Sequence, residues 1–306
     1  MQGTVALTGA TGFVGNVFLE NLLNDGWTVR ALTRRRHSSP EHPGLDWING
    51  DLHDQAALVE LVADADAVIH CAGTVRGRSQ AQFDRINVEG TANLVAACKT
   101  VDPLPRFLLI SSLAARQPEL SWYAGSKRRA EEVLEKDASG MPWTAFRPTA
   151  IYGKGDRELK PLFKAMQRHG VLPMPGFANT RFSLLHVDDL ARAMLCWLRA
   201  GKPVPGTFEL ADARPHGYDR HALADVAAEV WGRPVKTVSL PPAIVYLASY
   251  VNLVLAHVCR YSPMLTPGKV RELLYPDWVC DNTSITSALP DWQPGIHLTD
   301  ALPGVL

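Results

Sequence analysis

Residues 4–15 read TVALTGATGFVG, and this stretch decides the fold of a chain of 306 residues. Its first half suits a buried strand, and its second half places glycines as GxxGxxG where a helical pattern begins. Gly9, Gly12 and Gly15 would let the backbone turn tightly and approach a pyrophosphate, because a side chain would block both. The free N–H groups of the following helix would then face the phosphates. The spacing differs from the usual GxGxxG, and such a turn can also be merely structural.

Apolar runs alternate with amphipathic stretches through the first half of the chain. The run FLLI at 107–110 is apolar throughout, as in a strand that is buried on both faces of a parallel sheet. Strands that alternate with helices at this spacing predict the α/β fold class, with a doubly wound parallel sheet. We expect strands at 4–8, 28–33, 47–50, 67–71, 106–111 and 143–147, and helices near 13–25, 55–63, 81–99 and 123–137.

The regular alternation of strand and helix patterns ends after residue 147, where proline and glycine become frequent. A further helix at 187–199 and a strand at 206–210 would return to the sheet, and the rest would form a smaller lobe. We therefore expect two interleaved units without a flexible linker. Residues 1–150 and 182–212 would form the dinucleotide-binding domain, and residues 151–181 and 213–306 the C-terminal substrate lobe.

Composition argues against several classes of protein. Apolar residues make up 46% and charged residues 20%, as in an ordinary soluble protein, and the formal net charge of zero gives no electrostatic footprint for nucleic acid. The five cysteines are scattered without metal-ligand spacing, so we expect reduced thiols and no metal site. The first strand would begin by Thr4, which leaves no room for a signal peptide and predicts a cytoplasmic location.

The segment 242–258 is apolar almost all round. A helix that spans a membrane needs about 20 such residues, and this segment is shorter and carries Asn252 and His257. We expect a buried helix, or one that lines an apolar pocket. Peripheral contact with a membrane is the alternative, because a helix without a polar face is poorly suited to water.

Arginines follow the second expected strand, which ends in LTRRR at 32–36. An acidic side chain here would bind the ribose 2′-hydroxyl of a dinucleotide, whereas arginine suits a 2′-phosphate. Arg34 and Arg35 therefore favour NADP(H) over NAD(H). Arginines at this place can also belong to a solvated loop.

Two further strand ends could contact the dinucleotide. Asp51 and Leu52 follow the third strand, and Asp51 could accept a hydrogen bond from the adenine amino group. Ala72 and Gly73 follow the fourth strand and would form a wall of small residues that the cofactor can approach. Each of these signals is weak by itself.

Tyr123 and Lys127 stand four residues apart in an expected helix, shortly after Ser112. A phenol can exchange a proton with a substrate oxygen, but its free pKa of about 10 is too high for work at neutral pH. Residues i and i+4 share a helical face, so the Lys127 ammonium would lower the pKa of Tyr123 and could reach the cofactor's ribose. Ser112 could polarise the substrate oxygen. A Tyr-x-x-x-Lys pattern also arises by chance, and its place after a buried strand is what favours chemistry.

These residues closely resemble the short-chain dehydrogenase/reductase superfamily, and specifically its extended branch. The resemblance covers about residues 4–210 and also rests on VIHCAG (68–73), NVEGT (87–91), FRPTAIYG (146–153) and HVDDLA (186–191), the last of which we expect to be structural. It implies a Rossmann-type core, a nicotinamide cofactor and a catalytic triad of Ser112, Tyr123 and Lys127. The predicted cofactor-binding residues are Gly9, Thr11, Gly12, Phe13, Val14, Gly15, Arg34, Arg35, Asp51, Leu52, Ala72, Gly73, Tyr123, Lys127, Pro148, Ala150 and Ile151.

The extended branch includes sugar-nucleotide epimerases and dehydratases, hydroxysteroid dehydrogenases, and ketone or aldehyde reductases. Leu113 and Ala114 stand where the dehydratases carry an Asp-Glu pair, and the apolar helix at 242–258 suits a lipophilic substrate better than a diphosphate. We therefore expect an NADP(H)-dependent oxidoreductase that interconverts a hydroxyl and a carbonyl on an apolar or semi-polar molecule such as a sterol, ketone or aldehyde. The alternatives are an NAD-dependent sugar-nucleotide epimerase and a non-catalytic NADP(H)-binding sensor or assembly subunit. The resemblance also leads us to expect a homodimer.

Overall fold

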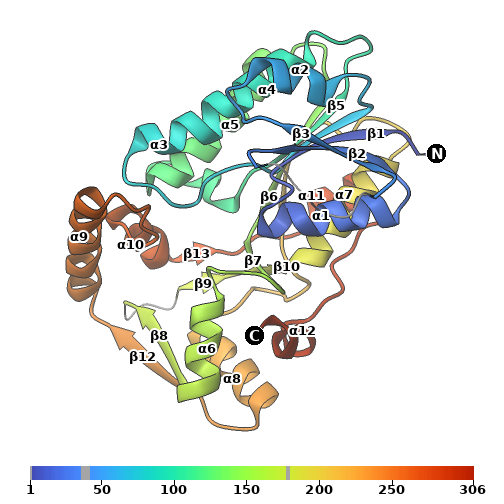
Figure 1. Cartoon of the computed structure of the whole chain (residues 1–306). Coiled ribbons are helices and arrows are strands. Elements are labelled where there is room, and N and C mark those ends of the chain that lie inside the picture. Colours follow the sequence, from blue (N-terminus) through green and yellow to red (C-terminus); the bar gives the residue numbers. More distant parts are fainter. Residues whose placement is uncertain (1, 36–41, 177–179) are drawn as a thin grey trace.

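Seven parallel strands form the central sheet of the computed structural model, which describes residues 2–35, 42–176 and 180–306. The order across the sheet is β11-β6-β5-β4-β1-β2-β3 (Figure 1). This order confirms the expected α/β fold, a Rossmann-type doubly wound sheet. The strands are β1 (Thr4–Thr8), β2 (Thr28–Thr33), β3 (Leu45–Asn49), β4 (Ala67–His70), β5 (Arg106–Ile110), β6 (Trp143–Pro148) and β11 (Gly206–Leu210).

Helices cover both faces of the sheet, as Figure 1 shows. One face shares a core with α1 (Phe13–Asn24), α7 (Val187–Arg199) and α11 (Thr283–Ala288). The other face shares a core with α2 (Gln55–Val62), α4 (Gly90–Cys98) and α5 (Trp122–Asp137). Because both faces are covered, β1, β4 and β5 are buried almost throughout, which explains their continuous apolar sequences.

The strand order reverses between β1 and β4. At such a point the connections leave toward opposite faces of the sheet, and a crevice opens at the carboxyl ends of the strands. The two loops meet closely here, since a Cβ on Gly9 would lie 2.6 Å from the backbone nitrogen of Ala72. The fold therefore places two predicted cofactor-binding segments, 9–15 and 72–73, side by side.

We expected one helix at 81–99, but the observed helix is interrupted by a π-helical turn. It consists of α3 (Gln80–Asp84), a π-helical turn η1 (Arg85–Glu89) and α4 in succession. A π turn is rare and often occurs at a functional site. The other helices and strands that we expected in this domain begin and end within about two residues of the prediction.

A smaller lobe lies below the nucleotide-binding domain in Figure 1. Strand β10, within residues 182–212, pairs with β7 rather than with the seven-stranded sheet, and the domain boundaries that we expected stay a prediction. The helices α6 (Lys160–His169), α8 (Arg220–Trp231) and α12 (Leu298–Val305) surround a third core. The parallel strand pairs are β7 (Ala150–Tyr152) with β10 (Leu184–His186), β8 (Val171–Pro175) with β12 (Lys236–Leu240), and β9 (Arg181–Phe182) with β13 (Asp277–Trp278).

Helix α9 (Pro242–Cys259) forms the outer edge of the lobe, beside α10 (Pro267–Leu274) (Figure 1). Our expectation of a buried or pocket-lining helix at 242–258 was wrong. Of the eighteen residues of α9, Val245, Ser249 and Ala256 are buried, because α10 packs against one side and the opposite side projects from the molecule. By length and composition alone, α9 is apolar enough to cross a membrane.

Asp189 anchors the C-terminal segment to the nucleotide-binding domain. It is buried near the start of α7, and its Oδ2 accepts the N–H groups of Gly295 at 3.2 Å and Ile296 at 3.0 Å. Its Oδ1 pairs with Arg192, and its backbone carbonyl accepts the indole N–H of Trp292 at 2.9 Å. The HVDDLA stretch therefore has the structural role that we expected.

We predict that Asp189→Ala lowers the free energy of unfolding by about 2–4 kcal/mol, because hydrogen bonds to a buried charged acceptor are lost. Urea denaturation followed by circular dichroism would measure the change. The neighbouring Asp188→Ala is the control, since the Asp188 side chain is 56% exposed, and it should change stability by less than about 0.5 kcal/mol. Equal effects of the two substitutions would contradict the anchoring role.

Candidate active site

The glycine loop after β1 is packed so tightly that side chains are excluded. Gly9 has a φ of 79°, and the N–H of Gly12 donates to its carbonyl at 2.9 Å. A Cβ on Gly15 would lie 2.1 Å from that same carbonyl oxygen. The first glycine therefore supplies a positive φ, and the last lets α1 start directly against the turn.

In the part of the chain that the structure describes, the N–H groups in the first turn of α1 are not capped by a side chain. Within the described residues 2–35, no side chain caps the helix at Gly12, and no acidic residue lies in its first turn. The N–H groups and the positive dipole end of α1 are therefore available to an anion. Thr11 and Gly12 are exposed, while Phe13 and Val14 are half-buried. These features fit the pyrophosphate of a dinucleotide, which is the role predicted for this loop.

A hollow of about 440 Å³ lies where β2 and β3 end. Arg34 and Asp51, two of the predicted contact residues, both line it. Arg34 and Arg35 are exposed, and neither guanidinium forms an ion pair with a residue that the structure describes. Arg36 lies outside the described residues. The hollow is completed by Asn49, Gly50, His53 and Asp54.

Gly73 brings the loop after β4 against α5, which carries Lys127. A Cβ on Gly73 would lie 3.1 Å from Oδ1 of Asn87 and 3.4 Å from Nζ of Lys127. The preceding Ala72 donates its N–H to the Thr8 hydroxyl at 3.2 Å. Leu52 is buried against Gly90, so it belongs to the core as well. Cofactor contacts of Leu52 and Ala72 stay predictions.

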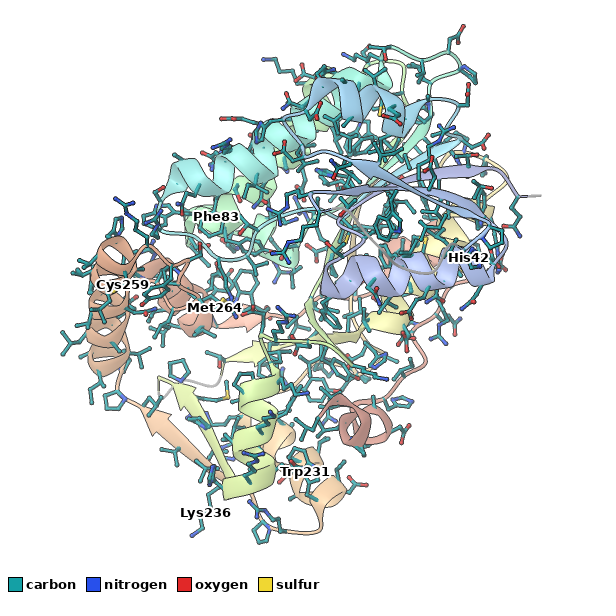
Figure 2. The ribbon with its side chains drawn as sticks, viewed as in Figure 1. His42, Phe83, Trp231, Lys236, Cys259 and Met264 are labelled. Atoms are coloured by element: carbon teal, nitrogen blue, oxygen red, sulfur yellow. The ribbon has the colours of Figure 1, made fainter. Side chains whose placement is uncertain are left out.

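The three predicted catalytic residues come together at the end of β5. Ser112 precedes the 3₁₀ turn η2 (Leu113–Arg116), where its hydroxyl accepts the Ala114 N–H at 3.2 Å and lies near the phenol of Tyr123. Lys127 is buried one turn further along α5, and its ammonium donates to the Ile110 carbonyl at 2.8 Å. Phe83 of α3, labelled in Figure 2, packs beside the Tyr123 ring with 6.3 Å between the ring centroids. An alcohol, a phenol and an ammonium therefore meet at the carboxyl edge of the sheet.

The pKa of Tyr123 differs from our expectation. Burial raises it to about 12, the nearby Ser112 hydroxyl opposes this rise, and the carboxylate of Glu272 adds to it. The expected lowering by Lys127 is therefore wrong for the chain by itself. Burial also lowers the pKa of the Lys127 ammonium.

Asn87 fastens the loop after β4 to α5. It is buried in the π turn η1, and its Oδ1 accepts the Thr74 N–H at 2.8 Å. Its amide nitrogen donates to the Thr74 carbonyl at 3.1 Å and to the Ser126 hydroxyl at 2.8 Å. These bonds hold Gly73, and hence the wall beside Lys127, in place.

Glu272 of α10 reaches the first turn of α5 from the other lobe. It is buried, it pairs with Lys269 at 2.8 Å, and its carboxylate accepts the hydroxyl of Ser121, the N-cap of α5. The contact is close, since a Cβ on Gly268 would lie 2.9 Å from the Cβ of Ser121. Helix α10 of the smaller lobe thus packs directly against the turn that precedes Tyr123.

Pro148, Ala150 and Ile151 lie where β6 passes into β7. Ala150 is exposed and Ile151 is half-buried, and the intervening Thr149 is buried. The chain crosses here from the sheet into the substrate lobe. Contact of these residues with the nicotinamide stays a prediction.

Residues 5–211 match the NAD dependent epimerase/dehydratase family. The chain belongs to this family. It is 35% identical over 295 residues to ceramide reductase of Caulobacter vibrioides, with 94% of this chain and 90% of that protein covered. It is 30% identical over 210 residues to 2-alkyl-3-oxoalkanoate reductase of Stenotrophomonas maltophilia, with 62% of this chain and 63% of that protein covered.

Solved structures of the epimerase/dehydratase family have the same fold. MoeE5 in complex with UDP-glucuronic acid and NAD superposes with a TM-score of 0.76 at 22% identity, with 99% of this chain and 97% of that chain covered. UDP-glucuronic acid 4-epimerase from Bacillus cereus, in complex with UDP-glucuronic acid and NAD, gives a TM-score of 0.74 at 18% identity, with 99% and 97% covered. The family and the reductases together identify an NAD(P)-dependent enzyme of the extended short-chain dehydrogenase/reductase type.

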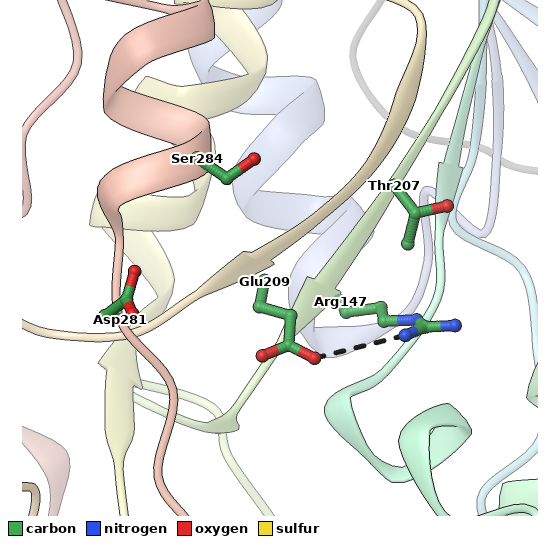
Figure 3. A pocket seen from close by; sticks show the side chains of 5 residues that line it. All are labelled: Arg147, Thr207, Glu209, Asp281 and Ser284. Atoms are coloured by element: carbon green, nitrogen blue, oxygen red, sulfur yellow. Dashed lines mark ion pairs between the residues drawn. The ribbon is translucent and has the colours of Figure 1, made fainter.

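A second hollow, of about 280 Å³, lies on the edge strand β11 (Figure 3). Arg147 projects toward it, pairs with the buried Glu131 at 2.6 Å and faces Glu209 at 4.0 Å. Because its charged side chains already have partners in the protein, the hollow carries no functional assignment. Its other lining residues are Thr207, Asp281 and Ser284.

Two acidic residues near the site were not predicted from the sequence. Glu131 accepts the hydroxyl of Ser111, directly beside Ser112, and its i+4 spacing from Lys127 was a usable signal. Glu272 lies in another lobe, and no local pattern connects it with Tyr123. Only the tertiary structure could reveal that second contact.

Proposed function

We propose that this enzyme uses NADPH to reduce a carbonyl group on an alkyl-chain lipid, with Tyr123 as the proton donor. The observation that carries the proposal is the place of Tyr123 at the carboxyl end of β5, near Ser112 and one helical turn before the buried Lys127. The substrate class is supported by two similar reductases, which are named for ceramide and for a 2-alkyl-3-oxoalkanoate. Both names describe molecules with alkyl chains.

Each residue of the site would have its own role in transferring a proton to the carbonyl oxygen. Bound NADPH would supply the hydride. Ser112 would hold the carbonyl oxygen, and the Tyr123 hydroxyl would donate its proton to that oxygen as negative charge develops on it. The phenolate left behind would be stabilised by the Ser112 hydroxyl, which lowers the pKa of Tyr123, while the Lys127 ammonium could reach the ribose of the cofactor. A raised pKa keeps Tyr123 protonated at neutral pH, as a proton donor requires.

Arg34 and Arg35, at the end of β2, support a preference for NADPH, because their guanidinium groups have no ion-pair partner among the described residues. Arg34 lines the hollow there, Arg35 is exposed beside it, and a 2′-phosphate would give each arginine a charged acceptor. Asp51 in the same hollow could accept from the adenine amino group. The solved neighbours that contain NAD are below 25% identity, so they do not decide the cofactor of this chain.

We predict that Tyr123→Phe lowers kcat for lipid-ketone reduction about 10²- to 10⁴-fold, because the proton donor is lost. The measurement follows NADPH oxidation with a long-chain 3-oxoacyl lipid in detergent. NADPH affinity should survive, and Tyr250→Phe, which alters an exposed phenol in α9, should retain full activity.

Unchanged turnover in Tyr123→Phe would overturn the role of Tyr123. If wild-type protein ignores the lipid ketone but converts a UDP-sugar without net NADPH consumption, the epimerase alternative is correct instead.

We predict that Glu272→Gln moves the alkaline limb of the reduction profile to lower pH. The Glu272 carboxylate raises the pKa of Tyr123, so its removal lowers that pKa. Reduction needs the protonated phenol and is lost as pH rises through its pKa, so the loss should begin at lower pH in the variant. The check is kcat/KM against pH, with Asp277→Asn, an exposed carboxylate of the same lobe, as control. An unmoved or upward-moved limb would show that Glu272 does not tune Tyr123.

We predict that replacing Arg34 and Arg35 together with alanine raises the KM for NADPH by about tenfold or more, since hydrogen bonds to a charged group contribute about 1.5–3 kcal/mol. The KM for NADH should hardly change, because NADH lacks the 2′-phosphate. Steady-state kinetics with both cofactors would measure this. A parallel rise for NADH, or a wild-type preference for NADH, would refute the assignment.

A further inference from the structure

The outer side of α9 exposes a continuous set of aliphatic side chains, here called the α9 surface. At 3.6 residues per turn they lie within an arc of about 100°. The buried residues Val245, Ser249 and Ala256 lie on the opposite side of the helix. The α9 surface consists of Ile244, Leu247, Val251, Val254, Leu255 and Val258, which are 49–75% exposed.

Three polar side chains of α9 have hydrogen-bond partners inside the protein, whereas the phenol of Tyr250 is exposed. Ser249 donates to the Tyr246 carbonyl at 2.7 Å, and Asn252 donates to the Leu265 carbonyl at 2.8 Å. A ring nitrogen of His257 lies 2.8 Å from the Leu253 carbonyl. The helix has no Asp, Glu, Lys or Arg. Little polar solvation would therefore be lost if α9 entered an apolar phase.

The charges next to the α9 surface are basic. Residues 241–275 contain Arg260, Lys269 and Arg271 but only one acid, Glu272, which is buried and paired with Lys269. Arg260 and Arg271 are exposed, and neither forms an ion pair with a described residue, although Nε of Arg271 donates to the Leu120 carbonyl at 2.7 Å. An anionic surface would complement these two cations. A two-fold contact with a second copy would bring basic rims together instead.

The connections of α9 favour an orientation in the plane of a bilayer. The helix is about 27 Å long at 1.5 Å per residue, close to the thickness of a hydrocarbon core. However, β12 leads directly into its start, and its midpoint is tied through Asn252 to Leu265, just before α10. Both elements belong to one folded lobe, so they lie on one side of a membrane. The helix would therefore lie in the interface rather than cross it.

We propose that the α9 surface docks this enzyme on an anionic lipid bilayer. The aliphatic side chains would enter the acyl-chain boundary, while Arg260, at the end of α9, would contact lipid phosphates. Figure 2 shows Cys259, at the end of α9, and Met264 on the side of the molecule where Phe83 lies. One helix, α10, separates the α9 surface from Ser121 and Tyr123. The docking would stand whatever the reaction proves to be, so it goes beyond the proposed function.

The test is flotation of the full chain with vesicles of phosphatidylcholine and phosphatidylglycerol, and with vesicles of phosphatidylcholine alone. Wild-type protein should float with the mixed vesicles and several-fold less with neutral ones. Replacing Leu247 and Val254 with glutamate should reduce bound protein at least tenfold. Arg260→Glu should weaken binding to mixed vesicles alone.

The matched control is Val59→Glu, because Val59 is an exposed valine on α2, in the other domain. It should bind like wild type, and all variants should keep the wild-type thermal shift with NADPH. Failure of wild type to float, or equal losses from Val59→Glu and the α9 double substitution, would overturn the proposal. A dimer that dissociates on the double substitution, without vesicle binding, would show that a second copy covers α9.

Discussion

The burial of the Lys127 ammonium is the constraint on which the rest of the site depends. A buried cation is costly unless its N–H groups find acceptors, and Lys127 reaches the Ile110 carbonyl at the end of β5. It also lies against Gly73, at the end of β4, where a side chain would crowd Nζ. Both positions exist only because neighbouring parallel strands end at one edge of the sheet. The doubly wound fold is thus a condition for the chemistry and not merely its support.

Helix α5, which carries Tyr123, belongs to the nucleotide-binding domain. Its first turn, however, is held by a residue of the smaller lobe. Ser121 caps α5, and its hydroxyl is held by Glu272 of α10. The same carboxylate raises the pKa of Tyr123. The substrate lobe therefore helps to determine how strongly the tyrosine holds its proton. Any displacement of α10 would change substrate access and the protonation of Tyr123 together.

Most of the nucleotide-binding domain could be predicted because its signals are local. Continuous apolar strands, the glycine turn and the i+4 spacing of Tyr123 and Lys127 each follow from geometry within a few residues. The pKa of Tyr123 could not be predicted, since it depends on burial and on Glu272 from another lobe. The exposure of α9 was missed for a related reason: an apolar sequence does not say whether a second layer covers it. A cytoplasmic location and a homodimer stay predictions.

The exposed apolar helix and the acid that tunes the tyrosine lie on consecutive elements. Exposed aliphatic area is unfavourable in water in proportion to its size, and α9 contributes only three buried residues to the fold. Its apolar character therefore does little for the core of the lobe. Docking at a bilayer would remove this area from water and bring α10, with Glu272, close to the lipid. A carbonyl on an alkyl chain could then approach Tyr123 while the chain itself stayed largely in an apolar phase.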